Sequence, residues 1–154
     1  MSVAFRRESD EEHKEPRFEL PIAPGPNLVT PRGLALIEAK VAAVEAAVAV
    51  AADDEARDVL KRELRYWHTR RSTAELAAAP AAGQAGIGSR VTFRLNGAVR
   101  TIAIVGGDEA EPATGRIGFQ APLARAVIGA EAGERVDFNG IAEAIEIVAV
   151  EEQG

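Results

Sequence analysis

Apolar residues in the first half of the chain recur at alternating spacings of three and four, which is the pattern of a coiled-coil seam. One run opens at Thr30-Pro31, a pair suited to cap and begin a helix, and ends near Ala51. A second run opens at Asp53-Asp54-Glu55, where acids favour a helix N-terminus. The connection is only a few residues long, so the pattern predicts an antiparallel helical hairpin over residues 27–79. The predicted seam positions are Leu34, Ile37, Val41, Val44 and Val48, then Leu60, Leu64, Trp67, Arg71, Ala74 and Ala78.

The second half changes to the alternating pattern of strands. Asn96-Gly97 and Asn139-Gly140 are two-residue turn signals, and Pro122 begins a short helix over 123–128 that Gly129 closes. We therefore predict an α+β fold, with a small curved antiparallel sheet wrapped on this helix over residues 88–152. The predicted strands are 89–95, 101–105, 116–119, 135–138 and 144–150.

Two segments show neither the helical nor the strand pattern of apolar residues. Residues 1–26 mix charges of both signs with four prolines, so we expect a largely disordered tail. Residues 80–87 continue a stretch of alanine, proline and glycine and are expected to form a linker between hairpin and sheet.

Composition removes several classes of function. The chain has no cysteine and only two histidines, which excludes thiol catalysis, disulfides and cysteine-ligated zinc. A net charge of −6 argues against bulk binding to DNA phosphates, although a local basic patch remains compatible with it. No apolar run is long enough for a membrane span, and the polar N-terminus lacks a signal core, so we expect neither membrane insertion nor secretion by that route.

Two charged groups on the hairpin each allow two interpretations. Asp53, Asp54 and Glu55 at the tip could hold Mg²⁺, but helix capping and dipole compensation account for such acids more simply. The basic residues of the second helix could form a patch facing RNA, or a solvated face with ion pairs to the first helix. The candidates for such a patch are Arg57, Lys61 and Arg65.

Three motifs of the second half resemble the C-terminal domain of the bacterial Gre transcript-cleavage factors: Val105–Pro112, Gly115-Arg116-Ile117 and Pro122–Ala126. Upstream, Asn27–Gly33 resembles the start of the Gre coiled coil. The resemblance implies an FKBP-like sheet domain that docks on the rim of the RNA polymerase secondary channel, with the hairpin directed toward the active site. The polymerase-binding candidates that it implies are Asp108, Glu109, Pro112, Pro122 and Arg125.

The hairpin departs from the family pattern. Gre factors carry a Gly-Asp-Leu-x-Glu-Asn-Ala-Glu tip whose acids help hold a second Mg²⁺, and this chain has no such segment. Its hairpin is roughly two dozen residues shorter than the family pattern. Each of the two antiparallel helices therefore loses about a dozen residues, which removes about 18 Å of reach at about 1.5 Å per residue. We therefore expect a monomeric polymerase-binding regulator of the bacterial cytoplasm, with no catalytic residue, metal or cofactor of its own. Nascent RNA or DNA in the elongation complex would be secondary partners.

Two alternatives remain open, and a third is disfavoured. The tip acids could still stimulate cleavage, with Mg²⁺ shared with the polymerase. The short hairpin also fits relatives that regulate nucleoside diphosphate kinase. A prolyl isomerase is disfavoured, because such pockets need several aromatics and the sheet region offers only Phe93, Phe119 and Phe138, some of which alternation assigns to the core.

Overall fold

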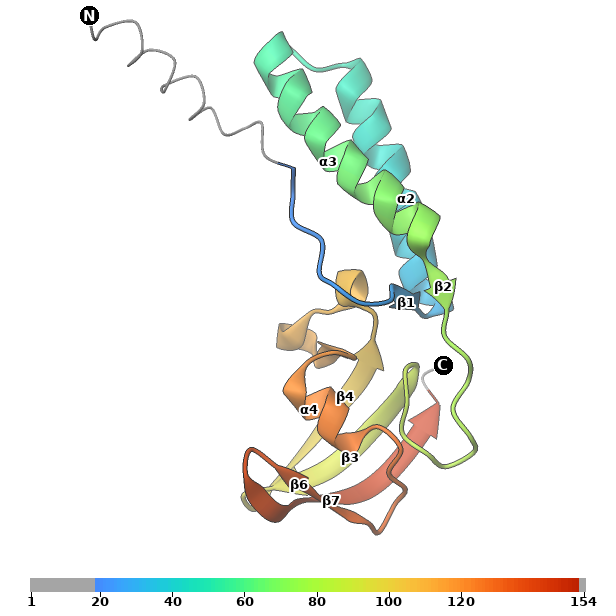
Figure 1. The fold of residues 1–154 in the computed structure, drawn as a ribbon, viewed down its shortest axis with the longest axis vertical. Coiled ribbons are helices and arrows are strands. Elements are labelled where there is room, and N and C mark those ends of the chain that lie inside the picture. The colour runs from blue at the N-terminus through green and yellow to red at the C-terminus, as the bar shows by residue number, and fades with distance from the viewer. Residues whose placement is uncertain (1–18, 153–154) are drawn as a thin grey trace, which may run out of the picture. The chain divides into compact units, whose positions relative to one another are not determined.

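The computed structural model of the chain describes residues 19–152 (Figure 1). Its described residues divide into two compact units. The hairpin unit comprises residues 19–25 and Glu38–Ser72, and the sheet unit comprises Pro26–Ile37 and residues 73–152. Most of the predicted disordered tail, residues 1–18, lies outside the described residues, whereas residues 19–25 are placed within the hairpin unit. Within residues 19–152, no helix combines the length and the apolar composition needed to cross a bilayer.

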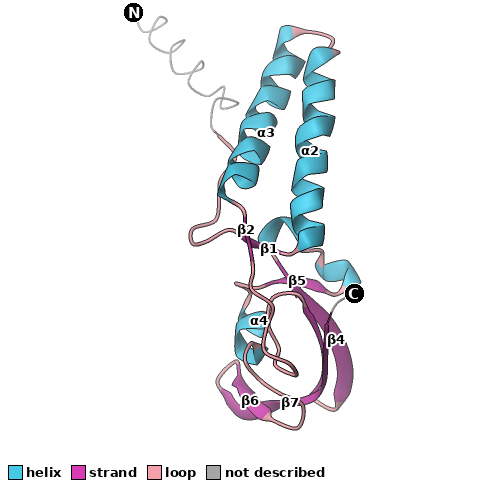
Figure 2. Cartoon of the chain, turned by 90° about the vertical axis from the view of Figure 1, so that its right-hand side faces the viewer, coloured by secondary structure: helices cyan, strands magenta, loops and turns pink. Residues whose placement is uncertain are grey.

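The two predicted helices are present as α2, Pro31–Ala49, and α3, Asp54–Thr73, and they run side by side in Figure 2. Their start signals act as expected. The Thr30 hydroxyl accepts a hydrogen bond from the Gly33 amide at 3.0 Å, and Asp53 Oδ1 accepts one from the Ala56 amide at 2.8 Å. Both side chains therefore satisfy backbone donors that a helix N-terminus leaves unpaired.

Near the end of α3, the buried position differs by one residue from the predicted seam. Arg71 was expected on the seam but is exposed, whereas Arg70 is buried. Its guanidinium carbon lies 6.0 Å from the centre of the Tyr66 ring. Arg70 follows Trp67 by three residues and Arg71 by four, so the continued alternation of spacings selected the wrong arginine.

The prediction that α3 continues to Ala78 is wrong. The helix ends at Thr73, and Glu75–Leu76 form strand β2, which pairs in parallel with β1, Leu28–Val29. Two backbone hydrogen bonds of 2.9 Å tie β2 to the β1 segment, from the amide of Glu75 to the Asn27 carbonyl and from the amide of Ala77 to the Val29 carbonyl. These long-range bonds replace the helical ones, so Ala74 and Ala78 do not continue the seam.

The sheet has the strand order β5-β4-β3-β7-β6. All its neighbouring pairs are antiparallel except β4 with β5, which is parallel, so the sheet is mixed rather than wholly antiparallel as predicted. The connection after β4 contains two 3-10 turns, η2 (Gly107–Glu109) and η3 (Pro112–Thr114), which return the chain beside β4 in the same direction. The strands are β3 Ser89–Leu95, β4 Ala98–Val105, β5 Arg116–Gly118, β6 Arg135–Phe138 and β7 Ile141–Glu152.

The sheet curves around the short helix α4, Pro122–Val127, as Figure 2 shows. Alternate residues of the central strands point toward α4, which contributes Ala124 and Val127 to the core. Positive φ angles at both predicted Asn-Gly turns, 53° and 78° at Asn96-Gly97 and 53° and 80° at Asn139-Gly140, confirm the turn geometry. The fully buried strand residues of this core include Val91, Phe93, Ile104, Ile145 and Ile147.

Candidate functional site

Glu109 lies at the end of η2 and is the most deeply buried acid among residues 19–152. The Thr30 hydroxyl donates a hydrogen bond to Glu109 Oε1 at 2.5 Å, and Arg32 Nη1 donates one to Oε2 at 2.9 Å. The Glu109 side chain is 1% exposed, whereas that of Arg32 is 52% exposed. A carboxylate at the N-terminal end of α2 also benefits from the helix dipole. Thr30, Arg32, Gly33 and Glu109 are called the Glu109 cluster below.

The backbone around the Glu109 cluster leaves no spare room. A methyl group at Gly33 would lie 2.9 Å from Glu109 Oε1. A methyl group at Gly106 would lie 2.5 Å from the carbonyl oxygen of Leu28. Glycine at these two positions therefore permits the close approach of the α2 start and β1 to the turn after β4.

Glu109 is one of the polymerase-binding candidates that the resemblance implies, and in the structure its side chain is buried. Both carboxylate oxygens already accept hydrogen bonds from within the sheet unit. The neighbouring candidates differ from it: Asp108 is half-buried, and Pro112, at the start of η3, is exposed. The sequence could not separate Glu109 from Asp108, because the donors that bury Glu109 come from residues 77 and 79 positions away.

Pro122 and Arg125 lie together at a shallow hollow of about 410 Å³ beside α4. Arg125 is exposed on the helix, and the hollow's other wall is the end of β6 and its turn. Besides Pro122 and Arg125, the hollow is lined by Ala126, Asp137, Phe138 and Asn139, and it is called the α4 hollow below.

Sequence reasoning missed the β6 side of the α4 hollow. The Asn139-Gly140 signal identified a turn, but nothing local indicated that the turn would lie opposite Arg125. Asp137 Oδ1 accepts a hydrogen bond from the Glu143 amide at 2.8 Å, which fixes the carboxylate beside the turn. The hollow thus combines a guanidinium, a carboxylate and the half-buried Phe138 ring, a set of groups suited to a partner protein's surface.

The acids of the hairpin tip are engaged locally. Asp53 caps α3, and Asp54 Oδ1 accepts a hydrogen bond from Arg57 Nη1 at 2.9 Å. The Asp54 side chain is 97% exposed. In the described part of the chain, no three His, Cys, Asp or Glu side chains come together in a way that could hold a metal ion. The geometry therefore supports capping at the tip.

The predicted basic patch is partly engaged in ion pairs. Besides Asp54, Arg57 contacts the Ala51 carbonyl oxygen at 3.3 Å. Arg65 donates from Nε and Nη2 to the two oxygens of Glu19, both at 2.8 Å. This bidentate pair lowers the pKa of the Glu19 carboxyl and raises the pKa of the Arg65 guanidinium. Lys61 is exposed on the same helix.

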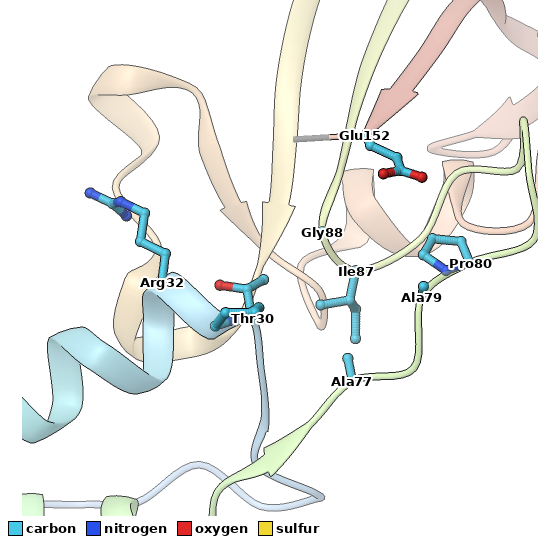
Figure 3. Close-up of a pocket in the computed structure, with 9 residues that line it drawn as sticks. Thr30, Arg32, Ala77, Ala79, Pro80, Ile87, Gly88 and Glu152 are labelled. Carbon is cyan, nitrogen blue, oxygen red and sulfur yellow. The ribbon is translucent and has the colours of Figure 1, made fainter. Parts of the chain in front are cut away.

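A second cavity, also of about 410 Å³, lies entirely within the sheet unit (Figure 3). Ile87 points toward Ala77 across it, whereas the Arg32 side chain points away. None of its lining residues is aromatic, so this cavity does not support the prolyl isomerase alternative. The lining residues are Thr30, Pro31, Arg32, Ala77, Ala79, Pro80, Ile87, Gly88 and Glu152.

Comparison with known proteins identifies the sheet region. Residues 80–152 match the family model described as the C-terminal domain of transcription elongation factors GreA/GreB. The chain is 43% identical over 53 residues to transcription elongation factor GreA of Thermomicrobium roseum, covering 34% of each chain. It is 40% identical over 77 residues to GreA of Leuconostoc mesenteroides, covering 47% of this chain and 48% of that protein. The chain thus spans about half or less of the length of these curated relatives.

Among solved structures, GreA/GreB from Nitrosomonas europaea aligns with 83% of this chain and 99% of its own at 14% identity and a TM-score of 0.40. The GreA factor homolog Gfh1 of Thermus thermophilus aligns with 82% of this chain and 99% of its own at 16% identity and a TM-score of 0.37. The family-model match covers the residues that form η2, α4 and the α4 hollow. Residues 80–152 therefore form a domain of the type found at the C-terminus of the GreA/GreB transcription elongation factors.

Proposed function

We propose that this protein binds bacterial RNA polymerase through its C-terminal domain, near the secondary channel, and regulates elongation without an effective RNA-cleavage tip. The family match over residues 80–152 carries the proposal, because it covers the domain that Gre factors are expected to dock with. In this proposal the protein acts as a monomer in the bacterial cytoplasm, and it needs no cofactor of its own.

The α4 hollow is the proposed docking surface. Arg125 is exposed there and can bind a partner carboxylate in bidentate fashion, while Phe138 offers an apolar contact beside it. Asp108, Pro112 and Pro122 remain candidate contacts. The proposed set gains Asp137 and Asn139 and omits Glu109, whose carboxylate is used internally.

The hairpin supports the absence of an effective cleavage tip. Helices of 19 and 20 residues extend only about 28–30 Å at about 1.5 Å per residue. At their tip, Asp53 and Asp54 already have partners that account for acids at a helix start. If the tip did stimulate RNA cleavage, it would have to share a Mg²⁺ ion with the polymerase, because single carboxylates bind this ion weakly without further ligands.

Binding to purified core RNA polymerase tests docking. Arg125→Glu reverses the charge in the α4 hollow and is expected to weaken binding by tenfold or more. Arg90→Glu makes the same charge change at an exposed position of β3 outside the hollow, and it serves as the matched control. Unchanged affinity of Arg125→Glu would contradict docking through this hollow, and failure of the wild-type protein to bind would contradict the proposed function itself.

RNA cleavage in backtracked elongation complexes tests the tip. The protein alone is expected to leave the RNA intact and, when added first, to suppress cleavage by a full-length Gre factor. Cleavage by the protein alone that disappears in the Asp54→Ala/Glu55→Ala double variant would establish the stimulator alternative instead. Polymerase binding without any effect on cleavage would direct attention to the kinase-regulator type of activity.

A further inference from the structure

The cavity of Figure 3 lies within the sheet unit and has walls that are held in place, and it is called the linker cavity below. Residues 80–87 were expected to be a linker, but both flanks of this segment are fastened. The Ala77 amide donates to a carbonyl of β1 at 2.9 Å, and the Gly88 amide donates to a carbonyl of β4 at 2.8 Å. Pro80 packs so closely on Gly86 that a methyl group there would lie 2.8 Å from the proline ring. A ligand would therefore meet a preformed surface, which spares it the cost of ordering the walls.

The side chains of the linker cavity are suited to a cation and not to an anion. Its two donor side chains, Thr30 and Arg32, both donate to Glu109, and Arg32 points away from the cavity. The positive end of the α2 dipole at this wall is compensated by the same Glu109 carboxylate. In Figure 3 the Glu152 side chain extends from the end of β7 toward Pro80. Glu152 forms no ion pair with any residue of the described range 19–152.

The other walls of the linker cavity are apolar. They are formed mainly by Ala77, Ala79, Pro80 and Ile87. An alkyl chain that ends in an ammonium group matches this arrangement, because its methylene groups can lie on the apolar wall while the ammonium donates to Glu152. The volume of about 410 Å³ is in the range of about 300–1,000 Å³ that is typical of ligand sites. A lysine side chain is the protein group with this chemistry.

A smaller hollow of about 140 Å³ continues the linker cavity along residues 80–84. The two hollows share Pro80, Gly88 and Glu152, and the smaller one adds Glu151. Glu151 lies opposite Arg90 in the register of β3 and β7, so Glu152 is the better partner for a cation. Two adjoining hollows form an elongated surface, which fits an extended peptide better than a small free amine.

We propose that the linker cavity binds a lysine side chain presented by an extended segment of a partner protein. The ammonium group contacts Glu152, the alkyl stem packs on Ile87 and Ala77, and the segment continues along the smaller hollow. This site is separate from the proposed polymerase-docking surface, because the linker cavity and the α4 hollow have no lining residue in common.

NMR titration of the nitrogen-15-labelled full chain with the peptide acetyl-Ala-Ala-Lys-Ala-Ala-amide tests the proposal. The amide signals of Ala77, Ala79 and Ile87 are expected to shift. A peptide with norleucine in place of lysine keeps the alkyl stem without the ammonium, and it should bind about twofold to fivefold more weakly, as expected for the loss of an exposed ion pair. An ionic strength of about 0.15 M limits non-specific attraction between the cationic peptide and this acidic chain.

Two variants assign the binding to the linker cavity. Glu152→Gln should weaken binding of the lysine peptide by about twofold to fivefold and leave the norleucine peptide unaffected. Glu143→Gln removes one negative charge from an exposed position near the start of β7, outside both hollows, and it is the matched control. Ala79→Leu places a larger side chain at an exposed position of the wall and should remove the shifts, while unchanged signals from the α4 hollow show that the domain is folded.

Several results would overturn the proposal. Equal binding of the lysine and norleucine peptides, or equal affinity of Glu152→Gln and Glu143→Gln, would remove the role of the ammonium group. Absence of shifts at the linker cavity would remove the site itself. Butylamine that bound as tightly as the lysine peptide would assign the cavity to small free amines instead of a protein segment. None of these results bears on polymerase docking, because no polymerase is present in the titration.

Discussion

Replacing Glu109 tests the role that burial assigns to it. In Glu109→Ala, the buried Thr30 hydroxyl loses its acceptor and Arg32 loses its partner. A hydrogen bond to a charged group contributes about 1.5–3 kcal/mol to stability. The loss at Arg32 is smaller, because its half-exposed guanidinium can form hydrogen bonds with water instead. Relief of the desolvation of the carboxylate offsets part of the loss. The expected net destabilisation is about 2 kcal/mol.

The conservative variant should separate charge from shape. Glu109→Gln retains an oxygen that can accept from Thr30 but turns an uncharged amide toward Arg32, so we expect a loss of about 1 kcal/mol. Thr30→Val removes both the hydrogen-bond donor to Glu109 and the N-cap of α2, and it should lower the free energy of unfolding by about 2 kcal/mol. Because the two side chains share one bond, the Thr30→Val/Glu109→Ala variant should lose about 1 kcal/mol less than the sum of the single changes.

Urea unfolding followed by far-ultraviolet circular dichroism measures these differences, and hydrogen exchange at the start of α2 localises them. The amides of Gly33 and Leu34 bond to the side chain and carbonyl of Thr30, so their protection should fall in Glu109→Ala. The exposed Glu111 is the control, and Glu111→Ala should change stability by less than about 0.5 kcal/mol. If Glu109→Ala unfolded at the same urea concentration as Glu111→Ala, the structural role of the Glu109 cluster would be refuted.

Three further predictions concern backbone space, capping and pH. Gly106→Ala should destabilise the sheet unit by about 1–3 kcal/mol, because its methyl group would meet a backbone carbonyl, whereas Gly107→Ala has open space and should be tolerated in the same thermal unfolding experiment. Asp53→Ala should cost the hairpin about 1 kcal/mol through the lost cap of α3, measurable by urea unfolding monitored at Trp67, and an unchanged midpoint would contradict it. The hydrogen bonds from Arg65 lower the pKa of the Glu19 carboxyl, so this ion pair should stabilise the packing of residues 19–22 on α3 above the usual carboxyl pKa. That contribution should be lost as pH falls through the lowered value. Carboxyl NMR titration of Glu19 measures this pKa, and an ordinary value would contradict the prediction.

Local patterns in the sequence predicted most of the helices and strands. The spacings of three and four predicted α2 and most of α3, and period-two alternation predicted the strands that surround α4. Both Asn-Gly turns and the Pro122 helix start also followed from the residues alone, because their backbone geometry depends on residue type at that position. The family resemblance came from the same region, where motifs and turns coincide.

Tertiary structure decided what depended on residues far apart in the chain. Glu75–Leu76 became a strand because β1 offered backbone partners, although the local pattern favoured helix. Glu109 became an internal hydrogen-bond acceptor because Thr30, 79 positions away, donates to it. The β6 side of the α4 hollow likewise exists only where the sheet curls around α4. Periodicity reports the local backbone and which face is apolar, whereas burial of a polar side chain is decided by partners that no local pattern specifies.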